Sequence, residues 1–98
     1  MKFNQLAADI AAVKNEIITK GWCQHTPQNA AGEVCLLGSL RVLNSDPQRM
    51  REARGVISFQ IMLQGYPAYL DLWNDKLGRT VEQVYNMLDK CITQAFVS

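Results

Sequence analysis

The fold class is decided by the stretch TVEQVYNMLDKCITQA, residues 80–95, which carries both a helix start signal and a helical stripe. Thr80 and Gln83 have the spacing of a capping box, in which the Thr hydroxyl accepts from the Gln83 amide while the Gln83 side chain bonds back to the cap. Apolar residues then recur on one face, at steps of four, three and four residues: Val84, Leu88, Cys91 and Ala95. We therefore expect a helix over about residues 81–95.

A matching helix is expected near the start of the chain, over about residues 4–20. Its apolar residues share one face, again at steps of four, three and four residues: Leu6, Ile10, Val13 and Ile17. Gly21 follows as a natural terminator, because glycine adopts the left-handed conformation that ends many helices. Short connections favour antiparallel packing of neighbouring helices.

A third helix is expected after Asp46, which can cap it, and Pro47, which suits the first helical position. Its apolar stripe is Met50, Ala53, Ile57 and Ile61. Gly65 and Pro67 end this helix, and one or two helical turns around residues 68–73 follow.

Residues 34–43 are apolar and fit either a strand or a buried helix. Leu36, Leu40 and Leu43 fit one helical face, so we favour a helix, with Gly38 as a small residue against which another element packs closely. A two-stranded hairpin between residues 22 and 35 is the alternative. The sequence therefore predicts an all-α, single-domain bundle of four or five helices over residues 1–98.

Composition excludes several classes of protein. Of the 98 residues 48% are apolar and 19% charged, with a formal charge of +1, so neither disorder nor attraction to nucleic acid or anionic lipid is expected. Asp9 and Lys14 interrupt any signal-peptide stretch, and no run reaches the roughly 18 apolar residues that span a bilayer. The cysteines number three, an odd count that argues against a secreted disulfide scaffold. We expect a cytoplasmic protein.

The cysteines permit two further interpretations. Cys23 and His25 form one Cys-x-His pair, but Cys35 and Cys91 stand alone, so the second ligand pair of a structural zinc site is missing. We therefore expect no metal and no cofactor. Cys35 near a helix start could be a nucleophile with His25 as base and Asp75 orienting it, although a core position explains it more simply.

The turn at residues 73–79 carries the densest polar chemistry. It is either a rigid corner, locked by an Arg79–Asp75 pair, or a pocket in which Asn74, Asp75 and Arg79 face a ligand. Trp22 is similarly either a lid on the core or an anchor for a partner. Because antiparallel terminal helices bring their ends together, we expect Trp22 and Trp73 on one side of the fold. Each indole N–H should then bond to Asn74, Asp75 or a carbonyl of loop 21–25.

An arginine cluster surrounds the start of the third helix, at Arg41, Arg49, Arg51 and Arg54. Cations oppose the helix dipole there, so an anion or an acidic protein surface is a candidate partner. A solvated face is the simpler interpretation. Without strong net charge or interleaved aromatic residues, nucleic acid is not favoured.

Three motifs together resemble those of a family of small uncharacterised proteins from bacteria and their phages. They are the Gly-Trp-Cys-Gln loop at 21–24, the Cys-x-Leu-Gly segment at 35–38 and the Trp-Asn-Asp turn at 73–75, and the similarity runs from about residue 10 to residue 92. His25 is not among the hallmarks. The resemblance supplies no activity; it implies that these motifs share one spatial site and that a phage or mobile-element origin is possible.

We therefore expect a small, non-enzymatic protein-binding module, an inhibitor of a host protein complex such as a defence system. The alternative is a small-ligand-binding or cysteine-dependent enzyme domain centred on Cys35. Candidate binding residues are of the types that anchor interfaces or shape pockets. They are Trp22, Gln24, His25, Arg49, Arg51, Arg54, Tyr66, Tyr69, Trp73, Asn74, Asp75 and Arg79. No catalytic residue is expected.

Overall fold

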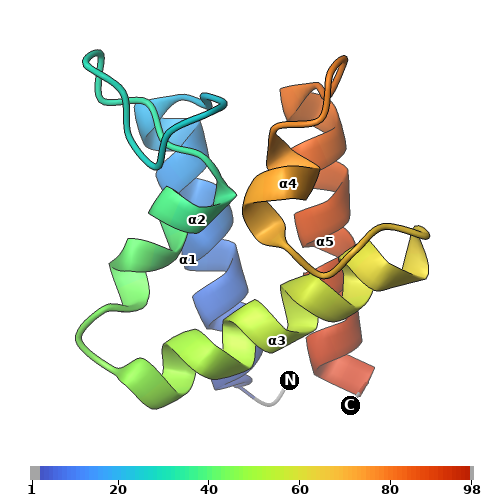
Figure 1. Cartoon of the computed structure of the whole chain (residues 1–98). Helices are drawn as coiled ribbons and strands as arrows, with labels where there is room; N and C mark the ends of the chain where they lie inside the picture. Colours follow the sequence, from blue (N-terminus) through green and yellow to red (C-terminus); the bar gives the residue numbers. More distant parts are fainter. Residues whose placement is uncertain (1–2, 98) are drawn as a thin grey trace.

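The computed structural model describes residues 3–97, and its elements are helices, the first two of which are joined by a long loop over residues 21–35 (Figure 1). In chain order they are α1 (Gln5–Lys20), α2 (Leu36–Ser39), the 3₁₀ helix η1 (Leu40–Leu43), α3 (Pro47–Leu63), α4 (Leu70–Asn74) and α5 (Val81–Val97). The all-α class is confirmed. Within the described residues the loop after α1 forms isolated bridges from Val34 to Trp22 and Gln28 in place of a hairpin.

The first and last long helices pack antiparallel, and α3 crosses them (Figure 1). Asn4, before α1, donates from Nδ2 to the carbonyl of Ala95 near the end of α5 at 2.9 Å. Farther along, the Lys14 ammonium is 2.7 Å from the Asp89 carboxylate. The expected antiparallel arrangement is confirmed. It closes a core from the predicted stripes: Ile10, Val13, Ile17, Ala53, Ile57, Ile61, Val84, Leu88, Cys91 and Ala95.

The helix start signals work as their spacing predicts. Thr80 Oγ1 accepts from the Gln83 amide at 3.3 Å, and Gln83 Oε1 accepts from the Thr80 amide at 3.1 Å, which completes the capping box. Asp46 caps α3 by accepting from the Arg49 amide at 3.2 Å, with Pro47 in the first turn. No helix within residues 3–97 has the length and hydrophobicity that crossing a membrane requires.

The segment 34–43 departs from the single helix expected. Its helix begins only at Leu36, because Val34 and Cys35 bond to the preceding loop through their amides, and it tightens to 3₁₀ geometry from Leu40. Gly38 has the predicted role of a close contact. A Cβ atom there would lie 2.0 Å from the carbonyl oxygen of Pro27, so only glycine lets the loop lie against α2.

Candidate functional site

Asn74 is fully buried, and its side chain joins three parts of the chain. Its Oδ1 accepts from the Trp22 indole N–H at 2.7 Å and from the Leu36 amide at 3.2 Å. Its Nδ2 donates to the Cys23 carbonyl at 3.1 Å and to the Asp75 carboxylate at 2.9 Å. These four bonds use the full hydrogen-bonding capacity of the amide, so Asn74 fastens the loop after α1 and the start of α2 to α4.

Further bonds complete this arrangement. Gln24 Nε2 donates to the carbonyls of Asn74 and Lys76 at 3.1 and 3.2 Å. The His25 amide donates to Asp75 Oδ1 at 2.8 Å, which holds His25 at a φ of 75°, in the left-handed region. We call this group the Asn74 knot; its members are Trp22, Cys23, Gln24, His25, Leu36, Asn74 and Asp75.

The knot confirms that the Trp22 and Trp73 motifs lie together, since Trp22 bonds to the residue beside Trp73. It also shows that the three motifs form one unit, which is held together by its own polar groups. Asn74 was the correct indole partner for Trp22. For Trp73 the expected partner was wrong, because its N–H donates to Gln64 Oε1 at 3.2 Å.

Arg79 lies against two aromatic rings on the other flank of the turn. Its guanidinium carbon is 3.8 Å from the centroid of the Trp73 ring and 5.3 Å from that of Tyr66. Its Nε donates to the Trp73 carbonyl at 2.9 Å and its Nη1 to Gln83 Oε1 at 3.3 Å. Its Nη2 is buried and has no acceptor among the described residues.

The predicted Arg79–Asp75 pair is wrong. No ion pair joins these two residues, both of which the structure describes, because the Asp75 carboxylate is taken by Asn74 and the His25 amide. Arg79 is instead drawn to the rings and the carbonyl on the opposite side of Trp73.

The arginine cluster divides into a structural and an exposed part. Arg49 donates two hydrogen bonds to the carboxylate of the buried Asp9, at 3.0 Å from Nε and 2.6 Å from Nη2. The hydrogen bond from Arg49 lowers the pKa of Asp9 below its ordinary value. Arg49 is therefore a structural residue, whereas Arg51 and Arg54 are exposed. The sequence feature that indicates a buried Asp9 is its place on the apolar face of α1, three residues after Leu6.

The cysteines are buried and free. Burial raises the pKa of Cys23, and it raises that of Cys91 to about 12. The Cys35 sulfur accepts from the Gly38 amide at 3.4 Å and so caps α2. In residues 3–97 no group of three or more His, Cys, Asp or Glu residues could hold a metal ion.

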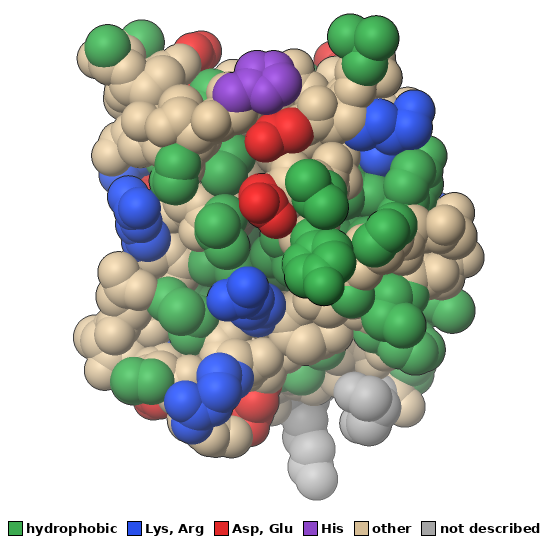
Figure 2. Space-filling view, viewed as in Figure 1, with side chains coloured by type: hydrophobic (Ala, Val, Ile, Leu, Met, Phe, Trp, Pro, Cys, Tyr) green, Lys and Arg blue, Asp and Glu red, His purple; other side chains and the backbone are tan. Residues whose placement is uncertain are grey.

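A small hollow of about 160 Å³ nevertheless brings several expected residues together. Cys35 and His25 line it with Asp71 and Asp75. In Figure 2 the histidine lies above two acidic side chains on this face. No hydrogen bond links Cys35 to His25, both described; the Cys35 sulfur instead accepts from the Gly38 amide of α2.

Apolar side chains gather where α3 ends and α4 begins (Figure 2). Leu63 and Tyr69 are each 63% exposed, Leu72 59% and Met62 57%. A hollow of about 270 Å³ lies beside them, lined by Tyr66, Pro67, Leu72, Trp73 and Lys76. We call the surface formed by Met62, Leu63, Tyr66, Pro67, Tyr69 and Leu72 the α3–α4 patch. The sequence pointed to Tyr66 and Tyr69 but missed the aliphatic members; for Met62 and Leu63 the available signal was their position off the apolar stripe of α3.

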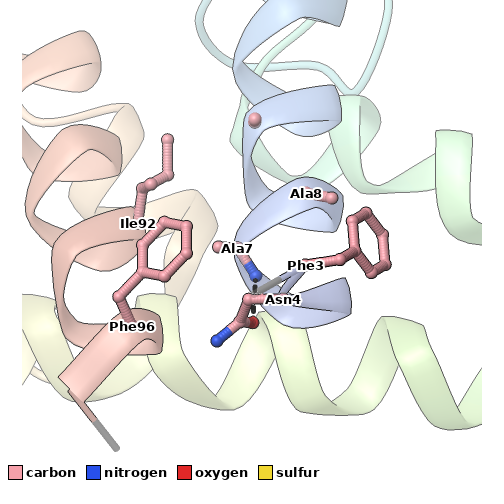
Figure 3. Close-up of a pocket in the computed structure, with 7 residues that line it drawn as sticks. Phe3, Asn4, Ala7, Ala8, Ile92 and Phe96 are labelled. Carbon is pink, nitrogen blue, oxygen red and sulfur yellow. Dashed lines mark hydrogen bonds between the residues drawn. The ribbon is translucent and has the colours of Figure 1, made fainter. Parts of the chain in front are cut away.

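A further hollow, of about 440 Å³, lies between the start of α1 and the end of α5 (Figure 3). Phe3 and Phe96 border it, with alanines of α1 along one side. Its one polar side chain, Asn4, already bonds through both side-chain atoms, to Ala7 and Ala95. None of the residues predicted as a site lies in it, and it lacks the convergent polar groups that orient a specific ligand.

Comparison with known proteins gives a single result. No curated protein and no solved structure matches the chain. A family model does match, over residues 1–94, and it describes a family of unknown function, DUF6197. The expectation of an uncharacterised family is confirmed, while a bacterial or phage source stays a prediction. The chain belongs to the DUF6197 family.

Proposed function

We propose that this protein is a small, non-enzymatic protein-binding module that contacts its partner through the α3–α4 patch. The observation that carries this proposal is the exposure of Leu63, Tyr69 and Leu72 beside a hollow. Exposed apolar side chains that gather on one face are typical of interaction sites, and aromatic residues and Met are enriched in them.

The partner we propose is a host protein complex, such as a defence system, which the module blocks by occupying a contact surface. The resemblance to small proteins of bacteria and their phages supports this role, as does a short chain with a rigid turn behind its patch. We place the protein in the cytoplasm, where free thiols such as Cys23, Cys35 and Cys91 stay reduced.

The test is affinity capture from lysates of several candidate hosts, using wild type and two double variants. Leu63→Ser with Leu72→Ser alters the patch. Ile18→Ser with Val42→Ser alters two exposed aliphatic residues elsewhere and is the matched control. We expect wild type and control to capture the same partner and the patch variant to lose it. Capture that is equal for all three, or no partner in any host, contradicts the proposal.

A second candidate function is a small-ligand or cysteine-dependent site at Cys35. The hollow that Cys35 shares with His25, Asp71 and Asp75 favours it. It requires a Cys35 thiol that reacts with iodoacetamide well below the free-thiol pKa of about 8.5, and function that Cys35→Ala removes. An inert Cys35, with function kept in the alanine variant, eliminates this candidate.

A further inference from the structure

Trp73 separates two hollows of different chemistry. On one side is the apolar hollow of the α3–α4 patch, bordered by Tyr66 and Leu72. On the other is a polar hollow of about 230 Å³ between the end of α3 and α5, to which Gln64, Arg79 and Lys90 contribute. The same ring lines both, so one partner segment can reach both.

The charges of the polar hollow all have one sign. Arg79 and Lys90 line it with the side chains of Gln64, Gln83 and Asn86, and no carboxylate is among its lining residues. Arg79 is fixed by its stacking on Trp73 and by two hydrogen bonds. A hollow with this lining attracts a negatively charged group.

The amide side chains present donors to the hollow. Gln64 Oε1 accepts from the Trp73 indole N–H, and Gln83 Oε1 accepts from the Thr80 amide and from Arg79. These three partners are donors only, so the chemistry fixes which end of each glutamine is the oxygen. The Nε2 groups of Gln64 and Gln83 therefore remain as donors, without an acceptor among the described residues.

Arg79 adds a third donor, which differs from the two exposed amides in being shielded from water. Its Nη2 is buried and lacks an acceptor in the described part of the chain, an arrangement that costs free energy in the unliganded protein. The side chains of Gln64 and Gln83 are exposed, so their Nε2 groups can donate to water and are available to a ligand at the same hollow. An acceptor group from outside that reaches Arg79 Nη2 would remove the cost of its missing bond. Carboxylates are such groups, since an ionised carboxylate accepts hydrogen bonds and donates none.

We propose that the polar hollow binds a carboxylate of the partner, carried by an acidic residue whose apolar neighbour enters the hollow beside Tyr66. This inference rests on the proposed protein-binding function and specifies its partner: an acidic segment with an adjacent apolar side chain. The complementary charges of Arg79, Lys90 and Lys76 select that segment over a neutral apolar one.

The test uses small probes with the full chain labelled with ¹⁵N. 3-Phenylpropionate carries both a ring and a carboxylate; 3-phenylpropanol has the ring alone, acetate the carboxylate alone, and phenyl phosphate a different anion. We expect 3-phenylpropionate to shift the NMR signals of the Trp73 indole, the Gln64 amide and Arg79 Nε. Its affinity should exceed that of each other probe by roughly tenfold, as expected for charge-assisted hydrogen bonds.

A substitution inverts the chemistry of the hollow without removing a contact. Gln64→Glu keeps the oxygen that accepts from Trp73 and replaces the donor Nε2 with a carboxylate oxygen. We expect it to weaken 3-phenylpropionate binding by about tenfold or more, whereas the exposed Gln48→Glu, with the same charge change, leaves it unaltered. Equal binding of propionate and propanol, tighter binding of the phosphate, or an indifferent Gln64→Glu overturns the inference.

The probe result and the capture result separate the two proposals. Probe binding that is lost in Gln64→Glu supports the carboxylate site even if no host partner is captured, which contradicts only the protein-binding function. Conversely, a partner lost through Leu72 substitution, with no probe binding, supports the patch and overturns the carboxylate site.

Discussion

The two flanks of the turn at residues 73–79 use polar side chains in opposite ways. On one flank, Asn74 is fully buried and has all four of its hydrogen bonds. On the other, Arg79 Nη2 is buried without an acceptor among the described residues, and the exposed Gln64 and Gln83 use their Oε1 atoms to accept bonds, which leaves their Nε2 groups available to solvent or a ligand. The first flank is complete without a ligand, and the second is the one at which we propose that a partner carboxylate binds.

This difference separates residues that build the protein from residues available for binding. A buried amide with every bond formed stabilises the fold and has nothing left for a partner. Donors in a hollow that lack a protein acceptor do not stabilise the fold, and they can donate hydrogen bonds to a partner's oxygen atoms. The hallmark motifs of the sequence therefore have mainly structural roles, and the binding that we propose uses the residues beside them.

The largest expected loss of stability comes from Asn74→Ala, which removes the side chain at the centre of the Asn74 knot. The Trp22 N–H, the Leu36 N–H and the Cys23 carbonyl each lose a partner, and stranded buried groups cost about 1–3 kcal/mol apiece. We expect the free energy of unfolding to fall by about 4 kcal/mol in urea titrations, with a shifted Trp22 emission. The exposed Asn86→Ala is the control and should change stability by less than about 0.5 kcal/mol. A loss below about 1 kcal/mol for Asn74→Ala would show that the knot is not structural.

Gly38→Ala tests the close contact on which the knot depends. The added Cβ atom would overlap the Pro27 carbonyl, so the loop must move away from α2, at a cost of about 2–3 kcal/mol. Gly55→Ala is the matched control, and we expect it to raise the stability that Gly38→Ala lowers. Its Cβ meets nothing within 4 Å and lies within α3, where alanine stabilises a helix by about 0.5–1 kcal/mol. Thermal unfolding of both variants measures the difference, and equal shifts in Tm would refute it.

Arg49→Ala tests whether Arg49, a candidate binding residue from the sequence, has a structural role like that of the Asn74 knot. Removing it leaves the buried Asp9 carboxylate without its main partner, which should cost about 2 kcal/mol at pH 7. The exposed Arg54→Ala should cost less than about 0.5 kcal/mol. Similar losses for the two arginines would contradict this division.

The Asp9 pair also predicts a pH dependence. Because the folded protein lowers the pKa of Asp9, its contribution to stability is complete above the ordinary pKa of that carboxyl. It is lost as the pH falls through the lowered value. Urea unfolding at a series of acidic pH values should show this loss in wild type and a smaller one in Arg49→Ala. The same slope in both would exclude Asp9 as its source.

The sequence predicted the parts of this structure that depend on local chemistry. Helix stripes and caps follow from spacing along the chain, so the long helices and the Thr80–Gln83 capping box were predictable. The proximity of Trp22 to the Asn74 turn followed from antiparallel helix ends. The partners of Asp75, Trp73 and Arg49 did not follow, because each is chosen by competition among groups brought together only in three dimensions. Arg79 had a carboxylate four residues away in sequence and bonded instead to the carbonyl and ring of Trp73.

The α3–α4 patch could also be predicted only in part from the sequence. Met62 and Leu63 stand off the stripe of α3, which marks them as exposed, yet nothing local shows that Leu72 lies close to them. That neighbourhood depends on the reversal of the chain between α3 and α4. Surfaces that are built from separate elements need the fold before they can be recognised.

The most direct test of the central claim applies one chemical change to both flanks. Asn74→Asp and Gln64→Glu each replace an amide nitrogen with an oxygen and keep the shape of the side chain. We predict that Asn74→Asp, which turns a donor toward Cys23 and Asp75 into a repelling acceptor, lowers the urea unfolding free energy by about 3 kcal/mol or more. Gln64→Glu should change it by less than about 0.5 kcal/mol, because its bond from Trp73 persists. Equal losses in the two variants, or none in either, would contradict the account.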